Sequence, residues 1–197
     1  NVNDVIAQAN NADVVVFVGG ISPYLEGEEM KVSEPGFNGG DRTDIELPQP
    51  QRDVITALHN AGKKVVFVNC SGGAVGLEPE SNNADAILQA WYPGEQGGKA
   101  VADVLFGDVN PSGKLPVTFY RNVSQLPDFL DYKMKGRTYR YFKGSPLFPF
   151  GYGLGYSLFS FGKPKYDKSK LYVDVANNGK YDGDEIVQIY IRRIADI

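Results

Sequence analysis

Carboxylates crowd one glycine- and proline-containing stretch of the sequence, between Gly19 and Pro48. They are Glu26, Glu28, Glu29, Glu34, Asp41, Asp44 and Glu46. Side chains of this type carry general acid–base chemistry when one group is held protonated beside another that is ionised. Partial burial or a like-charged neighbour raises the pKa of a carboxyl group, and a dense cluster can supply both conditions. A solvated acidic loop is the plainer interpretation, and the residues alone leave both open.

The elements on either side of this acidic stretch predict where it lies. Val14 to Gly19 is an apolar, β-branched run typical of a strand buried on both faces. A helix is expected around Asp53–Asn60, with a stop at Gly62, and Lys63 to Asn69 predicts a second buried strand. We expect these strands to be parallel neighbours. The acidic stretch then leaves the carboxyl edge of the sheet, where open α/β sheets place their ligand crevices.

Helices and strands alternate over the first 120 residues. Helical spacing opens the chain over residues 2–9, a third strand is expected within 84–92, and a short helix within 94–107. Residues 113–120 are strand-like, although Pro116 favours an edge position. The predicted fold class is α/β, a three-layer sandwich around a mostly parallel sheet.

From about Arg121 the pattern changes to an aromatic-rich segment with little periodicity, which predicts an extended arm up to residue 162. Residues 163–197 alternate apolar and polar side chains, so a partial antiparallel β segment is expected, with a hairpin-like pair over Leu171 to Arg193. Exposed strand edges recruit partners, which predicts either a homo-oligomer formed through this tail or high mobility of the tail.

Composition excludes several classes of function. The net charge of −4 and the scattered Lys and Arg residues argue against nucleic acid as a partner. A single Cys and a single His exclude the usual zinc sets, so no metal site is expected. No apolar window is long enough to span a membrane, so no membrane partner is expected. The chain opens on Asn1 rather than Met, which indicates a processed or excised part of a longer protein.

Two other chemistries fit the residues poorly. A serine hydrolase would need G-x-S-x-G, but Asn69 breaks that pattern before Ser71, and the only histidine, His59, precedes the serine. A nucleotide-binding α/β domain would need a glycine where Ser71 stands, so no cofactor is expected. Cys70 fits a small, buried strand-end residue. Glycoside hydrolysis, which uses two carboxyl groups, is compatible with the acidic stretch, and so is the plainer interpretation of a solvated loop.

Three stretches resemble glycoside hydrolase family 3, the β-glucosidases and β-xylosidases. They are "LEGEEMKVSEPGFNGGDRTDIELP", "AWYPGEQGGKAVADVLFGDVNPSGKLPVTF" and "LFPFGYGLGYSLFSF". The resemblance implies that residues 1–162 are the later part of the family's C-terminal α/β sandwich domain, and that 163–197 open a truncated fibronectin type III-like domain. It also implies a partner outside this chain, an N-terminal barrel domain that carries the aspartate nucleophile.

The resemblance implies roles for particular residues. Glu26, in the E-G dipeptide, is the first choice for the general acid/base, and Glu28 is the second; Asp41 and Arg42, in the G-D-R triplet, would organise the loop. Trp91 and Tyr92 are weaker candidates for lining the sugar site, since core packing explains them equally well.

The function implied is that of a fragment of a retaining exo-β-glycosidase, periplasmic or secreted. It would act on an oligosaccharide or aryl glycoside in the full-length protein and would be inactive alone. The long loop favours the β-xylosidase branch. The alternative is a non-catalytic carbohydrate-binding or docking domain.

Overall fold

The structure is a computed structural model and describes residues 1–192. The described chain divides into two compact units. The first contains Asn1–Gly97 and Val117–Phe150, and the second contains Gly98–Pro116 with the chain from Gly151 onward. The domain boundary expected near residue 162 remains a prediction. Among the described residues, no helix combines the length and apolar character needed to cross a membrane.

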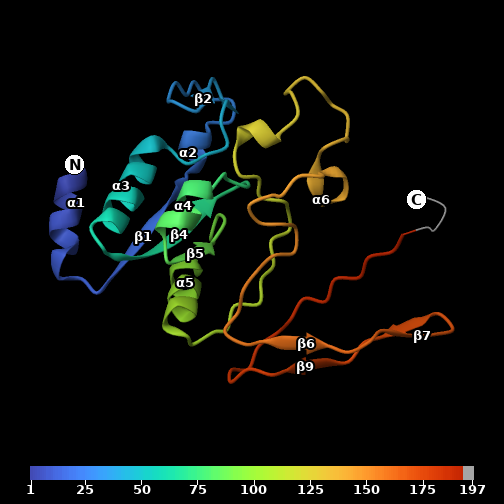
Figure 1. The fold of residues 1–197 in the computed structure, drawn as a ribbon. Helices are drawn as coiled ribbons and strands as arrows, with labels where there is room; N and C mark the ends of the chain where they lie inside the picture. Colours follow the sequence, from blue (N-terminus) through green and yellow to red (C-terminus); the bar gives the residue numbers. More distant parts are fainter. Residues whose placement is uncertain (193–197) are drawn as a thin grey trace. The chain divides into compact units, whose positions relative to one another are not determined.

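The first unit is built on a three-stranded parallel sheet in the order β1-β4-β5 (Figure 1). The strands are β1 (Val14–Ile21), β4 (Lys64–Ser71) and β5 (Ala86–Gln89). Val14 pairs with Lys64 at the start of β1, and Val66 pairs with Ala86 at the start of β5. The predicted α/β class and the parallel neighbourhood of the two apolar runs are confirmed.

Helices cover one face of this sheet. The chain opens with α1 (Val2–Gln8) and a 3-10 turn (Ala9–Asn11), and α3 (Gln49–Asn60) packs on α1, β1, β4 and α4 (Glu78–Asn83). Ile55 and Leu58 of α3 are fully buried, as are Val65 and Phe67 of β4. Their burial forms the core of the unit, since removal of apolar area from water is the main stabilising contribution.

Strand β1 departs from the sequence prediction on its other face. Val14, Val16 and Val18 are 51%, 49% and 64% exposed, so the expectation of burial on both faces is wrong for this strand. Successive side chains of a strand point to opposite faces, and α3 covers only the face that Phe17 and Gly19 share. In the described sheet β1 is also an edge strand.

The remaining elements of the first unit are short. β2 (Phe37–Asn38) and β3 (Asp41–Arg42) form a small antiparallel hairpin, and the arm carries a 3-10 turn (Val123–Gln125) and α6 (Thr138–Tyr141). Aromatic contacts occur along the arm: the Tyr139 and Phe150 rings stack with centroids 4.6 Å apart, and Tyr120 makes an edge-on contact with Phe142. The strand expected over 113–120 is reduced to one bridge between Phe119 and Phe148, because Pro116 has no N–H to donate to a ladder.

The second unit contains α5 (Gly97–Phe106), which continues from the first, and two antiparallel pairs. β6 (Phe159–Phe161) pairs with β9 (Val175–Asn177), and β7 (Lys165–Asp167) pairs with β8 (Lys170–Tyr172).

The antiparallel character of the tail is confirmed, but the pair expected within Leu171 to Arg193 is wrong in its partners. Both strands in that range pair with strands that precede it, and residues 178–192 contain no strand. Part of the tail is instead held by side chains: Lys114 forms an ion pair with Glu185 at 3.2 Å, and both side chains are mostly buried. Residues 193–197, the end of that predicted segment, lie outside the described residues.

Candidate active site

A single helical turn at the carboxyl end of β1 positions Glu26. The sequence specifies this turn, α2 (Pro23–Glu26), at both ends. Ser22 is the N-cap and its side chain accepts a hydrogen bond from the Leu25 amide at 3.2 Å, while Pro23 starts the helix with its backbone preset. Gly27 ends the turn in the left-handed conformation, with φ of 65°, where a glycine carries no steric penalty. Glu26 is therefore fixed at the last position of α2.

Glu26 and Tyr92 meet across the edge of the sheet. The Tyr92 hydroxyl donates a hydrogen bond to Glu26 Oε2 at 2.6 Å, although the two residues are far apart in the sequence. Burial raises the pKa of Tyr92 to about 12, and the bond to Glu26 adds to that rise. The phenol therefore stays protonated throughout the physiological range and remains a donor.

Gly72 packs against the Tyr92 ring, and Trp91 sets the backbone that precedes it. Gly72 lies against this ring so closely that a Cβ on that glycine would stand 2.5 Å from ring atom Cε2. Trp91 adopts a left-handed φ of 57°, which is uncommon for a non-glycine residue and redirects the chain just before Tyr92. The Trp91 ring makes an edge-on contact with Phe119, at 6.0 Å between centroids, and Phe119 is buried.

A buried polar network fixes the strand ends that carry Gly72 and Tyr92. The Asn69 amide donates to Gln89 Oε1 at 2.6 Å and to Ser71 Oγ at 3.2 Å, and the Ser71 hydroxyl donates to the Gly73 carbonyl at 2.9 Å. Asn69 and Ser71 are almost completely buried. Ser71 is therefore engaged in holding the turn after β4, which agrees with the exclusion of a serine nucleophile.

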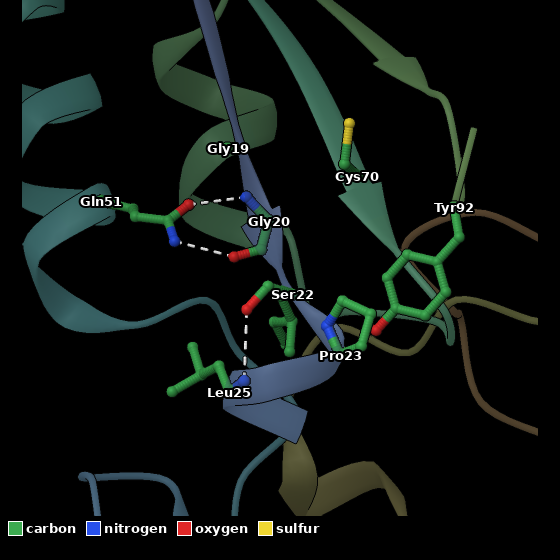
Figure 2. Close-up of a pocket in the computed structure, with 9 residues that line it drawn as sticks. Gly19, Gly20, Ser22, Pro23, Leu25, Gln51, Cys70 and Tyr92 are labelled. Carbon is green, nitrogen blue, oxygen red and sulfur yellow. Dashed lines mark hydrogen bonds between the residues drawn. The ribbon is translucent and has the colours of Figure 1, made fainter. Parts of the chain in front are cut away.

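A pocket of about 400 Å³ lies beside this end of the sheet (Figure 2). Its lining residues are Gly19, Gly20, Ile21, Ser22, Pro23, Leu25, Gln51, Cys70 and Tyr92. Gln51 of α3 holds the end of β1 through two hydrogen bonds of 2.8 Å with the backbone of Gly20, and the Tyr92 ring extends toward Pro23 of α2 (Figure 2). Burial raises the pKa of the Cys70 thiol, so it is less readily ionised than a free cysteine.

The far end of the acidic stretch is organised around Arg42. Its Nη2 donates to the Glu46 carbonyl at 3.1 Å, and the guanidinium lies 5.9 Å from the centroid of the Phe37 ring. Burial lowers the pKa of Arg42, and nearby carboxylates, Asp44 first and then Glu26, oppose that shift. The Arg42 guanidinium thus interacts electrostatically with carboxylates from both ends of the acidic stretch, Glu26 and Asp44.

Asp44 and Glu46 form a coupled acid pair at this end. Burial and the hydrogen bond shared with Asp44 raise the pKa of Glu46 to about 7, while the same hydrogen bond lowers the pKa of Asp44. The Asp44 carboxylate also accepts from the Glu46 amide at 2.7 Å. One proton is therefore shared between the two side chains at mildly acidic pH, and it resides on Glu46.

A buried charge pair lies behind this acid pair. Arg52 Nε of α3 is 3.5 Å from Glu80 Oε1 of α4, and Glu80 is only 1% exposed. Burial raises the pKa of Glu80, with Arg52 opposing the shift. Glu80 also acts weakly on Glu46 to raise its pKa.

The other residues singled out from the sequence lie apart from the Glu26–Tyr92 pair. Glu28, Glu29 and Asp41 are exposed. The described residues contain no ion pair between Asp41 and Arg42, since Arg42 turns toward Glu46. His59 is exposed on α3.

Sequence reasoning gave no role to Gly72, Glu46 or Glu80. The burial of Glu80 left no sequence signal, but the S-G-G turn after β4 marked the position of Gly72. Across the described residues, no three side chains of the metal-binding types cluster in a way that could hold an ion.

Comparison with known proteins identifies the family. The model of the glycosyl hydrolase family 3 C-terminal domain matches residues 1–156. The chain belongs to glycosyl hydrolase family 3. The resemblance based on the three sequence stretches is thereby confirmed.

Relatives of this family 3 chain include both xylosidases and glucosidases. It is 56% identical over 199 residues to a xylan 1,4-beta-xylosidase of Xylanibacter ruminicola, and 39% identical over 213 residues to a periplasmic beta-glucosidase of Salmonella typhimurium. Each match covers 98% of this chain but only 23% and 26% of the relatives. The chain thus spans about a quarter of the length of the curated relatives it matches.

A solved structure supports the fold assignment. The beta-glucosidase of Kluyveromyces marxianus in complex with glucose superposes with a TM-score of 0.74 at 32% sequence identity. The match covers 91% of this chain and 22% of that protein. The α/β fold described above is therefore that of a family 3 C-terminal domain.

Proposed function

We propose that this chain is the part of a retaining exo-β-glycosidase that supplies the general acid/base, Glu26, to a sugar site completed by a barrel domain of the same protein. The observation that carries the proposal is the Glu26–Tyr92 hydrogen bond at the carboxyl edge of the parallel sheet, next to a pocket. Glu26 is partly buried and held at one oxygen, whereas Glu28 and Glu29 are exposed.

The chemistry divides between two carboxyl groups. An aspartate of the barrel attacks the anomeric carbon and forms a glycosyl ester, while the bond from that carbon to the leaving oxygen breaks and its electron pair stays on the oxygen. Glu26 gives its proton to that oxygen and becomes a carboxylate. In the second half-reaction the Glu26 carboxylate takes a proton from water, whose oxygen displaces the aspartate and releases the free sugar.

The proposed substrate is a terminal β-xyloside, with β-glucoside second. Support comes from the xylosidase named as the relative at 56% identity and the glucosidase at 39%. Since that glucosidase is named as periplasmic, we also propose a periplasmic or secreted location.

On this proposal the chain is inactive without the barrel. A retaining mechanism needs the nucleophile about 5–5.5 Å from the acid/base carboxyl. General acid catalysis by itself contributes only about 10²–10⁴-fold. The isolated chain should therefore release no sugar from aryl β-xylosides or aryl β-glucosides, and measurable turnover would contradict this division of roles.

The decisive experiment uses the whole parent protein. Glu26→Gln should lower kcat/KM on a phenyl β-xyloside by roughly 10²–10⁴-fold, while Glu28→Gln should change it little. Loss confined to Glu28→Gln would transfer the acid role to that residue. A parent protein that is active with both substitutions, or inactive before any substitution, would favour the non-catalytic docking alternative.

A further inference from the structure

Tyr92 occupies a position that neither core packing nor a sugar platform explains. Its side chain is 42% exposed, so it is not a core residue, and its hydroxyl is already committed to Glu26 Oε2. A stacking platform needs only one open ring face, so that role would not explain why the hydroxyl is bound to Glu26 while Gly72 packs against one side of the ring. Gly72 instead packs against one side of the ring, and the hydroxyl is hydrogen-bonded to the candidate acid, Glu26.

The geometry assigns Tyr92 as the positioning residue of the general acid/base. This inference rests on the proposed function, because it takes Glu26 to be the proton donor. Tyr92 acts through Glu26 and need not touch the substrate. By occupying Oε2, it leaves Oε1 as the oxygen that faces the glycosidic bond and transfers the proton.

The hydrogen bond gains strength as the reaction proceeds. When Glu26 gives up its proton, negative charge develops on the carboxylate, and hydrogen bonds to charged acceptors are stronger than those between neutral groups. The Tyr92 hydroxyl is already in place at 2.6 Å, so no reorganisation is needed at that moment. The interaction therefore stabilises the transition state more than the bound substrate, and its loss should lower kcat rather than raise KM.

The surrounding structure holds this donor rigidly. Gly72 blocks the ring on one side, and the left-handed backbone of Trp91 sets the direction in which Tyr92 leaves the strand. The network of Asn69, Ser71 and Gln89 ties the ends of β4 and β5 to each other. A strained backbone conformation at one residue, held by well-ordered neighbours, is common where a functional side chain must point in a fixed direction.

The test uses the whole parent protein and leaving groups of different quality. Tyr92→Phe should reduce kcat on phenyl β-xyloside about tenfold or more, the effect of losing a hydrogen bond to a charged group, with KM nearly unchanged. On dinitrophenyl β-xyloside, whose aglycone departs without protonation, the loss in kcat/KM, which reports only the steps up to aglycone release, should be small. Tyr24→Phe is the matched control, because Tyr24 lies on α2 beside Glu26 but is 80% exposed.

A double substitution separates this inference from the proposed function. In a Glu26→Gln background, Tyr92→Phe should cause no further loss on phenyl β-xyloside. Equal losses of kcat/KM on both xylosides, or activity like that of the unsubstituted protein, would overturn the positioning role. If Glu26→Gln itself leaves phenyl β-xyloside turnover intact, the proposed function fails first and the role of Tyr92 falls with it.

Discussion

The two ends of the acidic loop use the same kind of residue in opposite ways. At its start, Glu26 accepts one hydrogen bond from a neutral phenol and borders a pocket. At its end, Asp44 and Glu46 share a proton beside Arg42, in front of the buried Arg52–Glu80 pair. The second group has the more extensive set of charge partners, and next to it the backbone bridge between Glu46 and Gly76 ties the loop to the segment before α4.

If Glu26 is the acid/base, as proposed, a strongly shifted carboxyl pKa is not sufficient to locate the active site. The raised pKa of Glu46 has a structural cause, since burial and Asp44 keep its proton in place. The proposed acid, Glu26, instead has one carboxylate oxygen held by the Tyr92 hydroxyl. Perturbed titration is a pointer to function only when the group also faces a site.

Breaking the charge pair behind the loop should have the largest effect on stability. Arg52→Met leaves the Glu80 carboxylate buried without its partner, and the free energy of unfolding should fall by about 3–5 kcal/mol near neutral pH. Because burial already raises the pKa of Glu80, the loss should shrink as the pH falls and Glu80 takes up a proton. Urea unfolding followed by Trp91 fluorescence at two pH values measures both quantities.

The control for that experiment is Lys64→Met, which removes a surface pair. Lys64 lies 3.0 Å from Asp85, but the two side chains are 71% and 41% exposed. Exposed ion pairs contribute little, so this substitution should leave unfolding almost unchanged. A similar loss in both variants would show that the Arg52–Glu80 pair is no more important than a surface contact.

Crowding the Tyr92 ring should have the next largest effect. Gly72→Ala places a Cβ 2.5 Å from the ring, and overpacking of this kind costs about 1–3 kcal/mol. Gly73→Ala is the matched control, because a Cβ there would meet nothing within 4 Å. Thermal unfolding of the two variants compares them directly, and equal midpoints would mean that the ring can move aside freely.

The proton on Glu46 predicts a pH dependence of stability. Its pKa rises from an ordinary value of 4.5 to about 7 in the folded chain, so the folded state binds more protons than the unfolded state between those values. Stability from this group is therefore present below about pH 4.5 and is lost as the pH rises through about 7.

Glu46→Gln should accordingly flatten the curve of melting temperature against pH by a few degrees between about pH 5 and about pH 8. Asp44, Arg52 and Glu80 also act on this group, so the unsubstituted chain and the variant must be compared at matched ionic strength. Parallel curves for the two proteins would show that the proton on Glu46 does not contribute to the pH dependence of stability.

The middle of the loop should respond least of all. Glu28 and Glu29 are exposed between the two organised ends. Glu29→Gln should change the free energy of unfolding by no more than about 0.5 kcal/mol, as is usual for surface substitutions. A larger effect, seen in the same urea titration, would show that the division into two ends and a passive middle is too simple.

The sequence predicted the parts of this site that depend on local order. The apolar runs predicted β1 and β4, and Trp91 and Tyr92 fall at the end of the expected third strand. Ser22, Pro23 and Gly27 are ordinary start and stop signals for a short helix, but α2 was not among the predicted elements. The sequence did not predict that Tyr92 would meet Glu26, because that contact depends on how the turns after β1 and β5 project over the sheet edge. The acid role itself remains a proposal.

Two other predictions were wrong because the sequence of a segment does not record which elements pack or pair with it. The valines of β1 looked like those of a strand covered on both sides, since composition records how apolar a strand is but not what packs on it. The pairing of the tail was misassigned because short alternating segments fit several registers, and here β8 and β9 pair with strands that come earlier in the chain.

The fastening of the loop at both ends makes its length adjustable. Ser22 caps the start, and at the other end the Gly76 amide donates to the Ile45 carbonyl at 2.7 Å. Val32 packs on Gly27 and accepts a hydrogen bond from the Gly39 amide, so the free part of the loop begins after it. Since closing a longer loop between fixed ends costs only about 0.6 kcal/mol for each doubling of its length, insertions between Ser33 and Glu34 should leave both ends in register. Lineages can therefore lengthen or trim this segment, and protein engineers can graft new sequence into it, while Glu26 keeps its aim.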